Sequence, residues 1–433
     1  MTFAFRTYLS VIAALFLSLQ GAFAQEDLND TQLRLNPEIG SDNTLANVKV
    51  RHYPFINYNA NKIDLNGDDW SELRSKLKQC KENGNFTVVH IGDSHIQPDG
   101  NTGRVRELFQ QKYGDAGRGI IIPFRMAGTN EPRDYVIKSD DPFIRARLLS
   151  MPWPTQMGFT GVSLEPESYI FSISLSVKSP CGFFTILSSG DLNLKKVESN
   201  GENIKFTSEK VVDGVDVSLD SDCTEMTLTM EGRNVNIFGF NLQNDNNGVV
   251  YHSIGNNGAA YSSYNSLPKF GESIADLCPD LVVLALGTNE AFGTVNEAAF
   301  EAQIEMMIKS IRSGSPDVKF LLVTPSECQK SVYSTTYSGK GRRRRARRVK
   351  SYQVNQKVKT VRDIIVRYGK KHNIPVYDFY EIAGGAGASS KWLEENLLNT
   401  DRIHRTWEGY KVEGELIYQA LSDALEKHRS QRR

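Results

Sequence analysis

The chain has 433 residues, a length that suggests two or three domains and allows at least one sizeable hydrophobic core. It carries 51 basic and 51 acidic residues, and this balance gives no overall field that would favour nucleic acid or a membrane surface. We therefore expect no nucleic-acid partner.

The N-terminus has the features of a secretory signal. Arg6 precedes an apolar run over residues 8–19, and Ala22, Phe23 and Ala24 supply the small-residue pattern of a signal-peptidase site. We expect a signal peptide over residues 1–24 and export to the periplasm or out of the cell. No later segment is long and apolar enough to span a bilayer, so no membrane span is expected after cleavage.

Residues 25–66 are rich in Asn and Asp without sustained periodicity, which indicates an irregular N-terminal segment. An amphipathic helix is expected next, opening at Asp68 and running to about Cys80. The β-rich run over residues 86–91 suits a central parallel strand, and a second helix is expected around residues 103–113.

Residues 131–247 have a different pattern of apolar and polar residues. The stretch 169–177 settles into strict alternation of apolar and polar residues, which is typical of an antiparallel strand. Further short runs follow, separated by Gly, Asn and Asp, at residues 182–187, 209–219, 225–230 and 234–242. We therefore expect an inserted all-β sandwich, jelly-roll-like, over this part of the chain.

Strand and helix patterns alternate again in the last part of the chain. Strands are expected at residues 248–254, 281–286, 320–323 and 375–378, and helices near 294–312, 349–371 and 406–428. This repetition predicts an α/β domain with a doubly wound sheet, built from residues 67–130 and 248–428 and split by the β insert.

A run of arginines, Arg342 to Arg345 with Arg347 and Arg348, follows two glycines that suggest a flexible approach to the next helix. It is either a solvated loop or a contact for an anionic polymer.

The five cysteines are an odd number for a disulfide framework. A bridge between Cys181 and Cys223 is open in an oxidising compartment, and Cys80, Cys278 and Cys328 are expected as buried thiols.

We expect no metal and no cofactor. No C-x-x-C or H-x-x-x-H spacing occurs, and His90 and His95 do not converge like an i,i+4 pair on a helix. His90 is expected to pack in the sheet.

Three separate stretches carry groups suited to nucleophilic catalysis. Ser94 in "HIGDSHIQ" follows a predicted strand, at the edge of the sheet where ligands bind in open α/β folds. In "TDRIH", the D-x-x-H spacing could bring Asp401 to one nitrogen of His404 and leave the other for Ser94. Taken alone, Ser94 could be a turn residue, and "TDRIH" could hold a surface Asp and a helix-capping histidine.

Two more strand ends could donate hydrogen bonds to a developing oxyanion. "LGTNE" places the amide of Asn289 after the most apolar strand, and "GNNGA" places Gly258 after another, with Gly255 as its rival. Singly, each reads as a plain turn.

In this order, "GDSH", "GNNGA", "GTNE" and "DRIH" resemble the blocks of the SGNH hydrolases, the GDSL-like esterase superfamily. The resemblance implies a flavodoxin-like three-layer hydrolase domain, with Ser94 as nucleophile, His404 as general base and then acid, and Asp401 as its orienting partner. It also implies an oxyanion hole made of the Ser94 N–H, the Gly258 N–H and the Asn289 amide.

The family often has leucine at the position of His95. The histidine form of this block is similar to that of peptidoglycan O-acetylesterases, which also carry a β-domain insert. The resemblance implies an exported serine esterase that removes O-acetyl groups from a cell-wall glycan. The alternatives are an acetylesterase for another polysaccharide such as xylan, an O-acetyltransferase, and a non-catalytic wall-binding protein.

Overall fold

The computed structural model describes residues 51–338 and 345–426. The expected signal peptide, residues 25–50 and Arg342 to Arg344 lie outside these ranges. The chain divides into the units Met1–Pro54 and Phe55–Arg433, and every helix and strand named below belongs to the second.

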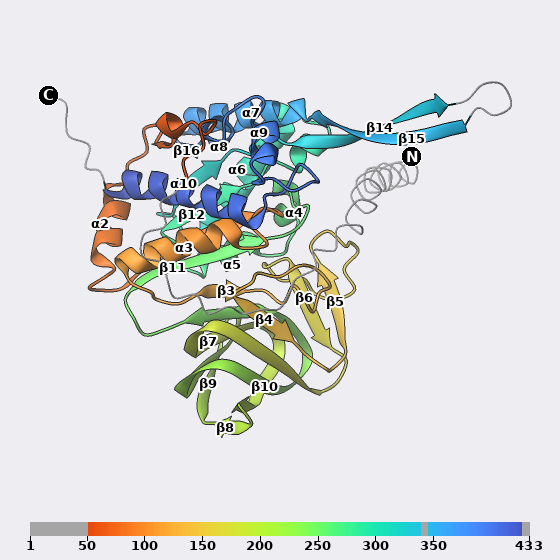
Figure 1. Cartoon of the computed structure of the whole chain (residues 1–433). Coiled ribbons are helices and arrows are strands. Elements are labelled where there is room, and N and C mark those ends of the chain that lie inside the picture. The colour runs from red at the N-terminus through yellow and green to blue at the C-terminus, as the bar shows by residue number, and fades with distance from the viewer. Residues whose placement is uncertain (1–50, 339–344, 427–433) are drawn as a thin grey trace, which may run out of the picture. The chain divides into compact units, whose positions relative to one another are not determined.

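A mixed sheet, mainly parallel, forms the centre of the α/β part (Figure 1). Its strands lie in the order β1 (Ile63–Asp64), β16 (Val376–Tyr377), β13 (Lys319–Val323), β12 (Leu281–Ala285), β2 (Asn85–Gly92) and β11 (Gly248–Gly255). All neighbours are parallel except β1, which pairs antiparallel with β16. The first parallel strand of the chain thus lies between the second and third, which is the flavodoxin-like order.

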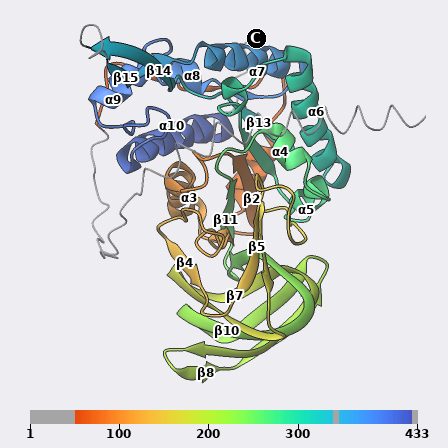
Figure 2. The same ribbon diagram turned by 90° about the vertical axis from the view of Figure 1, so that its right-hand side faces the viewer.

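Helices cover both faces of this sheet (Figure 2). One face carries α2 (Ser71–Gln79), α3 (Gly100–Tyr113) and α10 (Trp407–Glu426); the other carries α4 (Tyr261–Asn265), α5 (Phe270–Ala275), α6 (Glu297–Gly314) and α7 (Gln356–His372). Short helices complete the part: η1 (Tyr58–Ala60), η2 (Glu290–Phe292), α8 (Phe379–Ile382) and α9 (Ala388–Glu394). The predicted strand and helix repetition is confirmed, and β1 corrects the expectation that residues 25–66 are wholly irregular.

A second, antiparallel sheet lies between β2 and β11 in the sequence. Its strands are β3 (Gly119–Ile121), β4 (Tyr135–Lys138), β5 (Phe143–Arg147), β6 (Val162–Pro166), β7 (Ile170–Ser199), β8 (Glu202–Ile204), β9 (Phe206–Val211) and β10 (Gly214–Gln243). The expectation of separate short strands is wrong here, because most of the predicted runs are pieces of the 30-residue strands β7 and β10. Register shifts, for example between Arg233 and Asn236, let the pair bend without ending.

The antiparallel sheet has a hydrophobic cluster of its own. Phe171 and Phe184 on β7 and Phe240 on β10 are buried in it, whereas Tyr169, also expected in the core, is 52% exposed. This separate core supports an inserted β domain, while its sandwich form and its limits at residues 131 and 247 stay predictions. β3, from the segment assigned to the α/β domain, pairs with β10.

A two-stranded hairpin of β14 (Gln329–Ser338) and β15 (Arg345–Val354) projects from the α/β part (Figures 1 and 2). The expected helix over residues 349–371 is therefore wrong for residues 349–354, which are strand, and right for α7. The register of β15 is fixed by β14, whose Val, Thr and Tyr residues favour an extended chain.

The cysteines follow the expectation with one exception. Cys80 and Cys328 are buried, but Cys278 is exposed because it lies in the loop between α5 and β12. Cys181 and Cys223 are cross-strand partners of β7 and β10, and both are free thiols. Within the described ranges, no helix is long and apolar enough to cross a membrane.

A buried ion cluster joins α3 to the antiparallel sheet. Arg118, just before β3, donates from Nη2 to Asp99 at 2.7 Å and from Nε to Asp134 at 2.9 Å. Burial would raise the pKa of Asp99, but Arg106 and Arg118 lower it to about 2. Arg106 and Arg118 therefore share the charge compensation of Asp99, and Arg118 makes the shorter ion pair with Asp134.

The variant Arg118→Met should lower the free energy of unfolding by up to about 3 kcal/mol, since it leaves the buried carboxylate of Asp99 with Arg106 alone and removes the shorter ion pair of Asp134. Urea denaturation of the purified protein measures this change. The matched control is Lys195→Met, which removes a pair between an ammonium that is 53% exposed and Glu231, and should cost less than about 0.5 kcal/mol. Equal costs for the two variants would contradict the role of the cluster.

Candidate active site

Ser94 lies in a tight turn that follows β2. The carbonyl oxygen of Asp93 accepts hydrogen bonds from the N–H groups of Ile96 and Gln97, both at 3.1 Å, and closes the turn. The buried carboxylate of Asp93 accepts another from the N–H of His95 at 2.9 Å. This turn holds the Ser94 hydroxyl at the carboxyl edge of the sheet, where the sequence placed it.

Asp401 and His404 lie in the loop before α10, and a hydrogen-bonded chain joins them to Ser94. His404 Nδ1 lies 2.8 Å from Asp401 Oδ2, and His404 Nε2 lies 2.7 Å from Ser94 Oγ. Because the carboxylate only accepts, Nδ1 carries the proton and Nε2 accepts from the serine hydroxyl. The three residues are thus brought together in the expected order.

Asp401 is prepared for this contact by its own loop. Its Oδ1 accepts from the N–H groups of Ile403 at 2.8 Å and His404 at 3.0 Å, so the D-x-x-H turn fixes both partners. Burial raises the pKa of Asp401, but the hydrogen bond and the charge of His404 outweigh it and hold the pKa below its usual value. The group is therefore ionised at neutral pH and able to stabilise an imidazolium.

Asn289 lies after β12 and links two parts of the site. Its Nδ2 donates to the carbonyl oxygen of Ala259 at 2.9 Å and to Asp93 Oδ2 at 3.2 Å. Both amide hydrogens are therefore engaged by protein acceptors, the contact with Asp93 being the longer.

The two candidate glycines differ in what they do. Gly258 has a φ of +80°, next to Ala259, and its N–H has no hydrogen-bond partner in the described part of the chain. A Cβ on Gly255 would lie 2.3 Å from the backbone nitrogen of Gln97, so Gly255 lets β11 approach the serine turn closely. The geometry favours Gly258 as a donor and Gly255 as a packing residue.

Gln97 is a site residue that the sequence reasoning missed. Its buried side chain accepts from the Asn257 N–H at 2.7 Å and donates to the Asn130 carbonyl at 2.7 Å. It therefore ties the Gly258 loop to the serine turn. The only signal was its place in "HIGDSHIQ", three residues after Ser94.

The two histidines beside the serine are not arranged as metal ligands. His90 is buried in the sheet 2.8 Å from the hydroxyl of Tyr251, and burial lowers its pKa to about 3. His95 is half-buried, and its ring centre lies 5.3 Å from that of His404. Across residues 51–338 and 345–426, no three His, Cys, Asp or Glu side chains gather as metal ligands would.

Two buried carboxyl groups lie beneath the site. Burial raises the pKa of Asp93 to about 6, against the opposing hydrogen bond from the His95 N–H. Burial likewise raises the pKa of Glu290 to about 7. Glu290 Oε1 accepts from the Tyr261 N–H at 2.9 Å, whereas Oε2 has no hydrogen-bond partner among the described residues.

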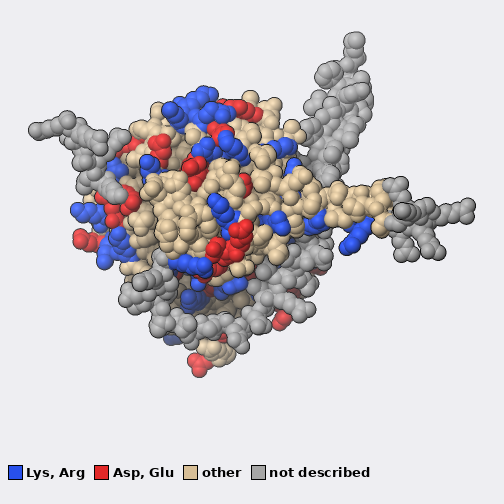
Figure 3. Space-filling model, turned by 45° about the horizontal axis from the view of Figure 1, so that its top comes forward, with Lys and Arg blue, Asp and Glu red and all other residues tan. Residues whose placement is uncertain are grey.

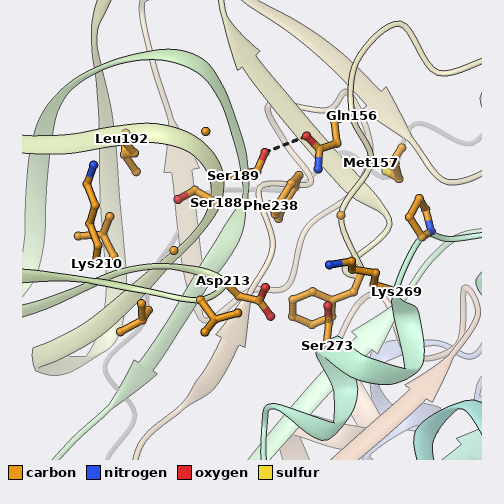
Figure 4. Close-up of a pocket in the computed structure, with 18 residues that line it drawn as sticks. Gln156, Met157, Ser188, Ser189, Leu192, Lys210, Asp213, Phe238, Lys269 and Ser273 are labelled. Atoms are coloured by element: carbon orange, nitrogen blue, oxygen red, sulfur yellow. Dashed lines mark hydrogen bonds between the residues drawn. The ribbon is translucent and has the colours of Figure 1, made fainter. Parts of the chain in front are cut away.

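A separate cavity of about 340 Å³ lies between the antiparallel sheet and the start of α5 (Figure 4). Asp213 and Lys269 line one side of it, and Ser189 Oγ donates to Gln156 Oε1 at 3.2 Å on another. None of the residues around Ser94 lines this cavity, so it takes no part in the chemistry described above.

The chain resembles a known hydrolase family in sequence and a solved esterase in fold. The model of the GDSL-like lipase/acylhydrolase family matches residues 224–412, a range that includes Asn289, Asp401 and His404. A solved structure of a peptidoglycan O-acetylesterase has a TM-score of 0.67 and 19% sequence identity, over 84% of this chain and 99% of that one. The expected resemblance to the GDSL-like hydrolases is confirmed, and the fold is shared with that esterase.

Two further solved structures match only part of the chain. A putative acylhydrolase from Bacteroides fragilis has 21% identity over 41% of this chain and 76% of its own, with a TM-score of 0.29. A carbohydrate esterase family 3 structure from Talaromyces cellulolyticus has 17% identity over 41% of this chain and 72% of its own, with a TM-score of 0.28. No curated protein matches the sequence.

Glu290 should make stability depend on pH. Its pKa rises from 4.5 to about 7 on folding, so the folded protein binds more protons between these values, and the free energy of unfolding falls as pH rises through this window. Glu290→Gln should remove the contribution of Glu290 to this fall, and the variant should gain up to about 3 kcal/mol over the wild type between pH 5 and pH 8.

Denaturant unfolding at pH 5, 6, 7 and 8 measures this difference. Glu408→Gln, at an exposed position of α10, is the matched control and should follow the wild type. Parallel curves for Glu290→Gln and the wild type would contradict a buried, neutral Glu290.

Proposed function

We propose that the chain is an exported serine esterase that removes O-acetyl groups from a cell-wall glycan, most directly peptidoglycan. The single observation that carries the proposal is the chain of hydrogen bonds from Ser94 through His404 to Asp401. Residues 67–130 and 248–428 would form the hydrolase domain, and residues 131–247 its β insert. The GDSL-like family match and the fold shared with a peptidoglycan O-acetylesterase support this reading.

The first half of the reaction acylates the serine. Ser94 Oγ attacks the carbonyl carbon of the acetyl ester while His404 Nε2 takes the hydroxyl proton. The tetrahedral intermediate then breaks its bond to the sugar oxygen, which receives that proton from His404 and leaves as an alcohol. Asp401 stays ionised throughout and stabilises the imidazolium from the Nδ1 side.

The second half releases acetate. A water molecule attacks the acetyl carbonyl, His404 removes its proton, and the bond to Ser94 Oγ breaks as the proton returns to the serine. In each half, the oxyanion is held by the N–H groups of Ser94 and Gly258 and by the Asn289 amide. For this, Asn289 exchanges its 3.2 Å contact with Asp93 for the oxyanion, while its bond to Ala259 keeps the amide in place.

The variant Ser94→Ala should fold as the wild type does and lose nearly all acetate release from O-acetylated peptidoglycan, because the Ser94 hydroxyl is the group that forms the acetyl-enzyme. The measurement compares acetate release by the two proteins from O-acetylated peptidoglycan and from acetylated xylan. Ser94-dependent release from xylan alone would move the substrate to another polysaccharide. Acetate release by Ser94→Ala at the wild-type rate would exclude Ser94 as the nucleophile.

The variant Asn289→Ala should lower kcat by about 10²–10³, the usual effect of removing one oxyanion donor. Steady-state kinetics with p-nitrophenyl acetate measure this, with circular dichroism as a check of folding. Asn289 also joins the Gly258 loop to Asp93, so the thermal midpoint is recorded in parallel. A loss of only a few-fold would leave Asn289 as a structural link without a catalytic role.

A further inference from the structure

The hairpin of β14 and β15 has two chemically different faces. Directly opposite residues of an antiparallel pair share a face, and every second residue follows on it. Tyr333 opposes Lys350, and Thr335 opposes Arg348. One face, which we name the aromatic–basic face, therefore carries Tyr333, Tyr337, Arg348, Lys350 and Tyr352. Lys330 and Arg347 lie on the opposite face.

Two of the three tyrosines on this face are exposed, and Tyr352 is half-buried. The side chains of Tyr333 and Tyr337 are 45% and 58% exposed. The Arg348 guanidinium lies 3.9 Å from the centre of the Tyr333 ring, so a cation and an aromatic ring are presented together. A two-stranded hairpin gains little stability from such rings unless something packs on them. They mark the face as a binding surface.

The charge of the hairpin is of one sign. From residue 329 to 354 the sequence contains Lys and Arg but no Asp or Glu, although basic and acidic residues balance over the whole chain. Figure 3 shows Lys and Arg atoms on the projecting arm. A surface of this kind attracts carboxylates and repels cations.

The aromatic–basic face begins at the catalytic loop. Gln329, the first residue of β14, donates from its N–H to the Arg402 carbonyl at 3.0 Å, and Arg402 Nη1 donates to Gln329 Oε1 at 2.7 Å. The Arg402 guanidinium lies 4.2 Å from the centre of the Tyr352 ring. Because Arg402 directly follows Asp401, the aromatic–basic face begins next to the loop of Asp401 and His404 and extends away from it.

We infer that the aromatic–basic face binds a carboxylate-bearing glycan strand whose acetyl ester reaches Ser94; this rests on the proposed function. Sugar rings pack their C–H faces on tyrosine rings, and Arg348 and Lys350 bind the carboxylates that the strand carries. From Gln329 to Tyr337 the strand extends roughly 27 Å at about 3.3 Å per residue. That length suits a polymer and cannot be used by a small ester.

The test removes the same charge from either face. R348A/K350A changes the aromatic–basic face, and K330A/R347A changes the opposite one. The ratio of kcat/KM for O-acetylated peptidoglycan to kcat/KM for p-nitrophenyl acetate should fall about fivefold in R348A/K350A, the size expected for two exposed ionic contacts. It should stay within twofold of wild type in K330A/R347A. The fall should shrink as salt is raised to 0.5 M, because salt screens exposed charges.

Tyr333→Ser tests the aromatic part. It should lower the same ratio and also lower acetate release from acetylated xylan, whose backbone sugars offer ring faces to the tyrosine. Equal effects of the two double variants, or an unchanged ratio in R348A/K350A and Tyr333→Ser, would overturn the inference. So would a dimer in sedimentation that R348A/K350A dissociates, because the face would then bind a second copy.

The outcomes for the two proposals remain separate. Absence of Ser94-dependent hydrolysis of p-nitrophenyl acetate would defeat the proposed function, and the comparison of the wild type with Ser94→Ala decides that point. Where this activity is present, a ratio that does not move defeats only the glycan-binding face.

Discussion

One buried carboxyl group, that of Asp93, connects the parts of the site. Its two oxygens accept from the His95 N–H and from the Asn289 amide, which in turn donates to the Ala259 carbonyl. The serine turn, the end of β12 and the Gly258 loop are therefore positioned against one another through a single side chain. Through these hydrogen bonds, the Asp93 carboxyl group makes the geometry of the serine turn depend on the ends of β12 and β11, which are far from it in the sequence.

Burial of Asp93 and Glu290 so close together has an electrostatic cost. Two ionised carboxylates in one dry region repel, and burial raises the pKa of both. The structure limits the cost by hydrogen bonds to each group, from the His95 N–H to Asp93 and from the Tyr261 N–H to Glu290. The charge that the reaction uses thus lies in the half-buried loop, while burial raises the pKa of the two other carboxyl groups and makes their ionised forms more costly.

The sequence predicted correctly those features that depend only on residues close together in the chain. Buried parallel strands such as β2 and β12 read as apolar runs, and the D-x-x-H spacing places Asp401 and His404 on one turn without any distant contact. The bent strands β7 and β10 were missed because bulges contain the same Gly and Asn residues as turns. The exposed Cys278 and the link made by Gln97 depend on tertiary contacts, which no local pattern encodes.

The base and the outer part of the hairpin make different contacts. At its base, Gln329 supports the loop that contains Arg402, whose φ of +63° is uncommon for a residue other than glycine, and also donates to Ser389 at 3.2 Å. Residues further out, such as Tyr333 and Arg348, take no part in the hydrogen bonds that Gln329 makes with that loop. We therefore expect substitutions in the middle of the strands to leave Asp401 and His404 in place, and substitutions at the base to disturb both.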